Sequence, residues 1–283
     1  MVPERVIGTQ DNPALLVRIH PESPLRRENR VAFDVLAQAL AQCHADRVTG
    51  ALRIVGNAGG LFHLRDGAVI SVESPGSPGV ESLLLSSGRI GEEDWTAALV
   101  ESVETRSLQA ALVGRGVIGA AELQGLVMDG VQDGAFAVAV GEIEQHVVDE
   151  GSDPPLLPAA EGVAPDLLLA ATGRRLEAIA SFSLSPYRDR VVPGDGADEA
   201  STAQRREIVA LADGRRTARD LAFALGRSLY PVTVEIALML ADGLLEIAPP
   251  ATSFRCTHWG LAALRPRAEV RPDLGISLKS SEV

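Results

Sequence analysis

The dipeptide Asp66-Gly67 stands between two short runs of apolar and β-branched residues. A two-residue loop of this kind needs positive φ at both positions, which Asp and Gly tolerate better than most residues. A further run of the same type comes earlier, across the glycine-rich segment 56–60. The three runs are 51–55, 61–65 and 68–73. This pattern predicts a three-stranded antiparallel meander, closed by a Pro/Gly/Ser-rich loop at 74–79.

A four-residue motif follows the meander and occurs twice, 28 residues apart. Gly88-Arg89-Ile90-Gly91 matches Gly116-Val117-Ile118-Gly119, and each copy has at least one acidic residue soon after it. We expect the first glycine to end a helix, the isoleucine to pack inward and the second glycine to cap the next helix. Acidic side chains in the first turn suit the helix dipole. The repeat therefore predicts two similar helix–turn–helix connections.

Apolar residues at helical spacing predict further helices in the first two thirds of the chain. They are expected at 31–43, 80–87, 123–147 and 165–182. The proline-rich stretch 149–163 is expected to be a loop. The segment 185–200, rich in Pro and Gly, is expected to link two domains.

Beyond residue 200 the pattern predicts three helices and two short strands. The helices are expected at 201–212, 218–225 and 231–241, and the strands at 244–248 and 253–257. Thr217 and Asp220 have the spacing of a capping box for the second helix, and Pro231 is expected at the first position of the third. Three helices followed by a β-hairpin are the arrangement of a winged helix.

Composition limits the class of protein. The chain has 283 residues and a formal net charge of −12, which disfavours non-specific attraction to nucleic acid or an anionic membrane. Its two cysteines, Cys43 and Cys256, lie far apart in the sequence, so we expect reduced thiols rather than a disulfide framework. We also expect no signal peptide and no membrane span, and a cytoplasmic location.

The stretch 49–99 resembles the PATAN domain family of bacterial response regulators and signalling proteins. The segments that carry the resemblance are Gly50-Ala51-Leu52-Arg53-Ile54, Gly60-Leu61-Phe62-His63-Leu64-Arg65-Asp66-Gly67, Ile70-Ser71-Val72-Glu73, and the Leu83-Leu84 helix between Gly79 and Gly88. Gly173-Arg174-Arg175-Leu176-Glu177 resembles the helical extension of such domains. Residues 201–248 look like an actinobacterial-type winged helix. The resemblance implies partner-binding or dimerising modules without defined catalytic residues.

The expected fold is α+β: an antiparallel β-meander with a helical bundle extension, then a C-terminal winged helix. We expect the following organisation along the chain: a flexible arm at 1–30, a PATAN-like domain at 31–184, a linker at 185–200, a winged helix at 201–262 and a disordered tail at 263–283.

Motifs for catalysis, cofactors and metals are not found. The five histidines, none of them three or four residues from another, are His20, His44, His63, His146 and His258. With two dispersed cysteines, this spacing does not suit a zinc site. The segment 56–60 lacks the Lys-Ser/Thr of a phosphate-binding P-loop. We therefore expect no catalytic residue, cofactor or metal, and a protein that is not an enzyme.

The predicted hairpin supplies the candidate partner-binding residues His63, Arg65 and Asp66. His63 and Arg65 would share one face of their strand, because alternate residues point the same way. We expect His63 to be a surface polar residue, with a role at a recognition edge as the alternative.

The predicted winged helix raises the question of DNA binding. Its third helix would meet the bases, yet 231–240 contains no basic residue and one acid, Glu235. Four arginines near the second helix could contact phosphates if the chain bound DNA: Arg215, Arg216, Arg219 and Arg227. We therefore expect a regulatory adaptor with a protein partner from a signalling pathway or a second copy of the chain. A DNA-binding transcriptional regulator is the alternative, and a membrane partner is not expected.

Overall fold

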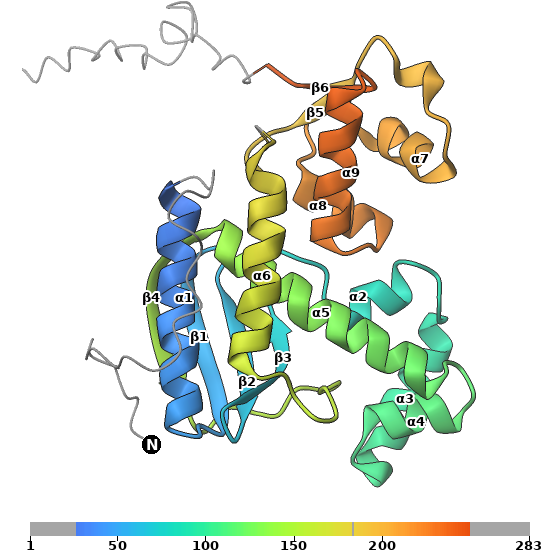
Figure 1. The fold of residues 1–283 in the computed structure, drawn as a ribbon. Coiled ribbons are helices and arrows are strands. Elements are labelled where there is room, and N and C mark those ends of the chain that lie inside the picture. The colour runs from blue at the N-terminus through green and yellow to red at the C-terminus, as the bar shows by residue number, and fades with distance from the viewer. Residues whose placement is uncertain (1–26, 183, 250–283) are drawn as a thin grey trace, which may run out of the picture. The chain divides into compact units, whose positions relative to one another are not determined.

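The computed structural model describes residues 27–182 and 184–249, and its largest sheet has four antiparallel strands (Figure 1). They are β1 (Gly50–Asn57), β2 (Gly60–Arg65), β3 (Ala68–Glu73) and β4 (Glu142–Asp149). Their spatial order is β3-β2-β1-β4. The first three form the predicted meander, and the turn between β2 and β3 has the predicted positive φ, 50° at Asp66 and 76° at Gly67.

The strand β4 corrects one expectation. The helix predicted over 123–147 ends at Val140, and after Gly141 the chain becomes extended and pairs with β1. Ala51 pairs with Asp149 and Leu52 with Val148, so β4 adds an edge to the meander. Residues 150–164 contain no helix, as predicted, and one isolated bridge at Val163.

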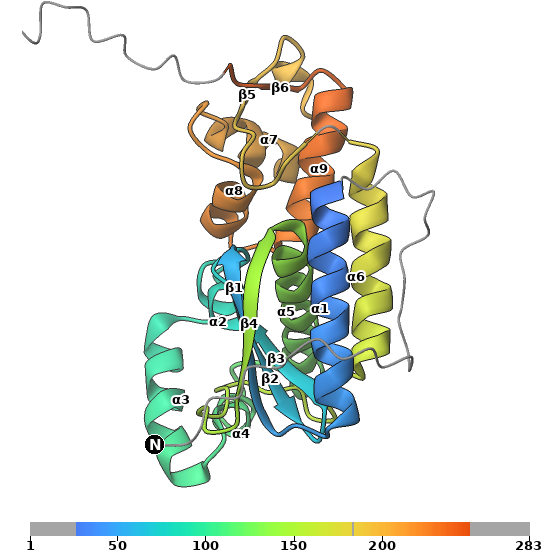
Figure 2. The same ribbon diagram turned by 90° about the vertical axis from the view of Figure 1, so that its left-hand side faces the viewer.

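The helices in the first two thirds of the chain are α1 (Arg27–Ala45), α2 (Val80–Leu85), α3 (Glu92–Thr105), α4 (Leu108–Gly114), α5 (Ala120–Val140) and α6 (Pro165–Ala180). Three of them, α1, α5 and α6, cover one face of the sheet (Figure 1 and Figure 2). Figure 2 shows α1, α5 and α6 side by side against the sheet. The start of α1 at Arg27 places the last four residues of the predicted arm in a helix. Residues 1–26 lie outside the described part.

The repeated glycine motif has the predicted structure in both copies. Gly88 and Gly116 take positive φ of 71° and 70° at the ends of helices. Gly91 and Gly119 are the N-caps of α3 and α5, and the isoleucine of each copy is buried. A second hydrophobic cluster forms around these connections and includes Trp95.

Beyond residue 184 the structure has three helices and a two-stranded ribbon. The elements are β5 (Val191–Pro193), a 3-10 turn (Ala197–Glu199), α7 (Ala203–Leu211), α8 (Ala218–Leu225), α9 (Leu229–Ala241) and β6 (Leu245–Ile247). The predicted capping box of Thr217 and Asp220 begins α8. Pro231 is the third residue of α9 rather than the first, because the helix begins two residues earlier.

The short strand β6 pairs antiparallel with β5, which lies inside the predicted linker 185–200. The partner strand expected at 253–257 falls outside the described residues, as do the tail 263–283 and Cys256. The helices α8 and α9 meet at 120°, an angle typical of a helix–turn–helix.

The helix α9 packs against α5 and α6 and shares their hydrophobic core. The rings of Phe136 on α5 and Tyr230 on α9 meet edge to face with centroids 5.2 Å apart. The described residues as far as Ala248 belong to one compact unit. The helices predicted as a second domain are therefore continuous in packing with the helical layer that covers the sheet.

No single helix in the described ranges has the length and apolarity needed to cross a bilayer. The helices α8 and α9 have the required length and apolarity only when they are taken as one segment, and that segment is bent by 120°.

Candidate functional site

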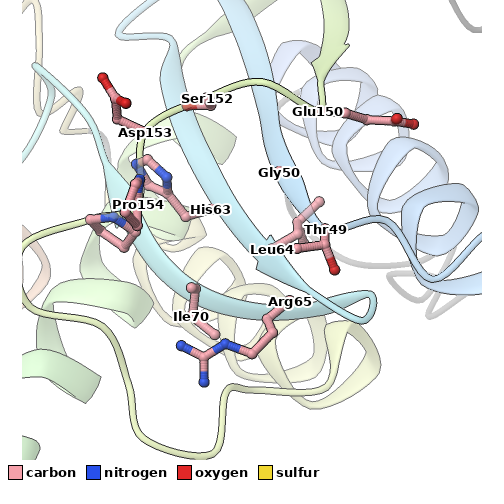
Figure 3. Close-up of a pocket in the computed structure, with 11 residues that line it drawn as sticks. Thr49, Gly50, His63, Leu64, Arg65, Ile70, Glu150, Ser152, Asp153 and Pro154 are labelled. Atoms are coloured by element: carbon pink, nitrogen blue, oxygen red, sulfur yellow. The ribbon is translucent and has the colours of Figure 1, made fainter.

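A cavity of about 190 Å³ lies on the sheet face opposite the helical layer, beneath the loop that follows β4 (Figure 3). The side chains of Phe62 and Leu64 on β2 point into the core, so the alternate residues His63 and Arg65 point to this other face. Both His63 and Arg65 line the cavity. The structure therefore brings two of the three predicted partner-binding residues together.

His63 is buried, with 5% of its surface exposed, and this corrects the expectation of a surface residue. The burial comes from the loop 150–155, which passes over the strand face. Figure 3 shows the imidazole beneath the part of the loop that carries Ser152, Asp153 and Pro154. Such a deeply buried side chain has little surface to offer to a protein partner.

Glu73 on β3 is the charged neighbour of His63. Its Oε1 lies 3.3 Å from Nε2 of His63, without hydrogen-bond geometry. Nε2 of His63 is buried and has no hydrogen-bond partner within the described chain. Burial lowers the pKa of His63 and the nearby carboxylate of Glu73 opposes this, with a net lowering. The imidazole is therefore held in its neutral form near pH 7.

The loop over His63 is fixed at the edge of β3. Val69 and Val163 exchange backbone hydrogen bonds of 2.8 and 2.7 Å, and the N–H of Ala159 donates to the carbonyl of Ile70 at 2.7 Å. These bonds satisfy backbone groups that an edge strand would otherwise expose. The C-terminal part of this loop, at Ala159 and Val163, is thus held against β3 by backbone hydrogen bonds.

Arg65 and Asp66 remain at the surface. Nη1 of Arg65 donates to the carbonyl of Ala160 at 3.4 Å. The backbone N–H of Asp66 donates to Oγ1 of Thr49 at 3.0 Å, and its side chain does not line the cavity.

Four polar residues that line the cavity were not predicted: Thr49, Glu150, Ser152 and Asp153. Thr49 precedes β1, and the other three come from the loop after β4. No local signal marks them, because the loop reaches the strand face through contacts distant in sequence.

The arginines proposed for DNA phosphates are mostly engaged within the chain. Arg216 donates to the carbonyl of Leu211 at 2.9 Å. Nε of Arg219 donates to the carbonyl of Pro75 at 2.9 Å. Arg227 pairs with Glu207 at 2.7 Å.

Arg215 differs from these three. Its side chain is exposed and forms no ion pair within the residues that the structure describes. It is therefore the one member of the predicted set whose guanidinium is left for an external anion.

The junction of α5, α6 and α9 contains a buried carboxylate. Asp133 has no exposed surface, and it accepts hydrogen bonds from the backbone N–H groups of Leu229 and Tyr230. Nη1 of Arg175 lies 3.8 Å from it, and this guanidinium stacks over the ring of Tyr230. Burial raises the pKa of Asp133 to about 6, although these donors and Arg175 favour the charged form.

In the described part of the chain, no group of three or more His, Cys, Asp and Glu side chains is arranged to hold a metal ion. Comparison of the sequence and fold with protein-family models, curated proteins and solved structures finds no match.

Proposed function

We propose that this chain is a cytoplasmic, non-enzymatic regulatory adaptor, in which a PATAN-type sensor domain is joined to a winged helix that binds protein. The observation that carries the proposal is the outward face of α9. This is the helix that a DNA-reading winged helix inserts into the major groove, where it needs side chains that hydrogen-bond to base edges.

The two faces of α9 support a role other than base reading. Val232, Ile236 and Met239 are fully buried in the common core. Pro231 and Leu238 are the exposed large side chains of the outward face, and neither donates a hydrogen bond. The outward face is therefore apolar, as the centre of a protein interface is.

The polar group on this helix is also engaged within the chain. Glu235 accepts a hydrogen bond from Nε of Arg205 at 2.6 Å, and the same arginine binds Asp242 at 2.9 Å. This pairing engages Glu235 within the chain, so its carboxylate is not free for base recognition.

The packing of α5 supports a coupled sensor and output. The helix α5 contacts β3 on one side and α9 on the other, and Asp133 holds the first turn of α9. A conformational change in the sheet could therefore be transmitted through α5 to α9, whose outward face we propose binds a partner.

Affinity purification from the native host, followed by reconstitution with the purified partner, tests the proposal. We expect Leu238→Asp to weaken the reconstituted complex at least tenfold, because it places a charge in the apolar face. The matched control is Leu167→Asp on α6, which changes a leucine that is 65% exposed on another surface and should leave affinity unchanged. Equal affinity of wild type and Leu238→Asp would contradict this assignment.

The alternative, a DNA-binding regulator, is tested by an electrophoretic shift assay at moderate salt with promoter DNA from near the gene. We expect no shift. A salt-dependent shift that is lost in Arg215→Ala with Arg216→Ala would favour the alternative.

A further inference from the structure

We propose that the outer face of α3, formed by Glu93, Thr96, Val100, Val103 and Glu104, docks a basic amphipathic helix of a partner protein. This face lies on a different helix from α9, and nothing in the function proposed above is needed for it. Figure 2 shows α3 at the edge of the ribbon, away from the sheet.

The outer face of α3 has an apolar stripe. Val100 and Val103 are the most exposed large apolar side chains in the described residues, at 68% and 79%. Thr96 lies four residues before Val100, so the three side chains follow one line along the helix. On the other side of α3, Trp95 and Ala98 are buried in the second hydrophobic cluster. The helix is therefore fixed with its valines outward, and only contact with another molecule can remove them from water.

The same face carries unpaired negative charge. Glu93 and Glu104 are exposed, and neither forms an ion pair within the described residues. The helix has five acidic residues and no basic one. Asp94 and Glu101, on its flank, lie 3.7 and 3.8 Å from Arg115. The carboxylates beside the valines are therefore the ones left for an external cation.

The stability of α3 does not account for this face. An acidic residue in the first turn suits the helix dipole, which explains Glu93, but Glu104 lies in the last turn, where negative charge is unfavourable. Exposed valine also has a lower helix propensity than alanine or leucine. Residues that go against local stability are typical of functional surfaces.

Charge and shape together select the occupant. A second copy of the chain would bring the same carboxylates against this face, and nucleic acid or an anionic membrane is also repelled. Lys or Arg side chains would pair with Glu93 and Glu104, while apolar side chains between them cover the valines. The spacing by four and three residues is that of a coiled-coil seam, so a helix fits it best.

Three peptides separate charge from amphipathicity. The probe is a fluorescein-labelled peptide of about 18 residues, or about five helical turns, with leucines spaced by three and four residues and lysines beside them. A scrambled peptide keeps the charge but loses the apolar stripe, and a third peptide has glutamate in place of lysine. Fluorescence anisotropy with the full chain measures their affinities. We expect the probe to bind in a salt-dependent way, the scrambled peptide to bind at least tenfold more weakly, and the glutamate peptide not to bind.

One pair of variants tests the apolar stripe. Val100→Asn with Val103→Asn keeps the charge of the face and should weaken probe binding at least tenfold. The matched control is Val31→Asn with Leu167→Asn, which changes side chains that are 55% and 65% exposed on α1 and α6. This control should bind as wild type does.

A second pair of variants tests the carboxylates. Glu93→Gln with Glu104→Gln should weaken probe binding about fivefold and reduce its salt dependence. The matched control is Glu144→Gln with Glu177→Gln, which removes the same net charge at exposed positions of β4 and α6. It should stay within about twofold of wild type, because distant exposed charges are screened.

The proposal is overturned if the probe does not bind, if the scrambled peptide binds equally, or if either α3 variant keeps wild-type affinity. A dimer of the full chain that Val100→Asn with Val103→Asn dissociates in analytical ultracentrifugation would also overturn it, because a second copy would then cover the face. Every substituted position is exposed, so we expect all variants to fold. Partner binding through Leu238 is measured on α9, so failure at α3 leaves the proposed function separately testable.

Discussion

Oδ2 of Asp133 accepts a 2.6 Å hydrogen bond from the backbone N–H of Leu229, so a carboxylate on α5 caps the N-terminus of α9. Oδ1 accepts a second, 2.8 Å bond from the N–H of Tyr230. The local N-cap residue, Ser228, makes no side-chain capping bond. The cap is thus supplied by a residue 96 positions earlier, which ties the helical layer of the sheet to α9.

Removal of this cap is expected to destabilise the protein. Asp133→Ala leaves two buried N–H groups without an acceptor and Arg175 without its carboxylate, while it also removes the cost of burying a charge. We expect a net loss of about 2 kcal/mol in the free energy of unfolding, measured with urea. Asp129→Ala, at an exposed position one turn earlier, should change it by less than about 0.5 kcal/mol. Similar losses in both variants would contradict the capping role.

The raised pKa of Asp133 predicts a pH dependence of stability. The folded protein binds a proton at Asp133 near pH 6, whereas the unfolded chain does so near 3.8. The contribution of this group to the free energy of unfolding therefore grows as the pH falls from 7 towards 4, by about 1 kcal/mol between pH 7 and 5. Because other groups, His63 among them, titrate in both proteins, the measurement is the difference between wild type and Asp133→Ala. Parallel curves would show that Asp133 does not titrate in this range.

The sequence predicted those turns and helix ends that are determined by neighbouring residues. Asp66-Gly67 specified its turn because few other pairs accept positive φ at both positions, and the structure has φ of 50° and 76° there. The motif around Gly88 and Gly116 likewise predicted where helices end and begin. Thr217 predicted the start of α8 through a capping box that needs only residues of the first turn.

The sequence did not predict features that depend on contacts between residues far apart in the chain. The strand β4 exists because residues 142–149 pair with β1, about 90 positions earlier, and its own pattern looked like a continuation of the helix before it. His63 was expected at the surface because the loop that buries it follows β4. Asp133 carried no signal at all, since its partners are the backbone groups of α9.

Cys43 is expected to be unreactive in the folded protein. It has no exposed surface, and burial raises the pKa of its thiol to about 12, so almost no thiolate is present at neutral pH. In a Cys256→Ser variant, Ellman's reagent should react with Cys43 only as fast as the protein unfolds, and quickly in urea. Complete reaction within seconds under native conditions would contradict the burial of α1 against the sheet.

Two glycines on α5 should respond oppositely to the same substitution. A Cβ at Gly134 would lie 2.8 Å from Cγ1 and 3.0 Å from the carbonyl oxygen of Val72, so Gly134→Ala must push α5 away from β3. We expect it to lower the free energy of unfolding by about 1–3 kcal/mol. A Cβ at Gly125, on the same helix, would meet nothing within 4 Å, and Gly125→Ala should raise it by about 0.5–1 kcal/mol through helix propensity. Urea unfolding of both variants measures the difference, and a stabilising Gly134→Ala would show that α5 does not pack this closely on β3.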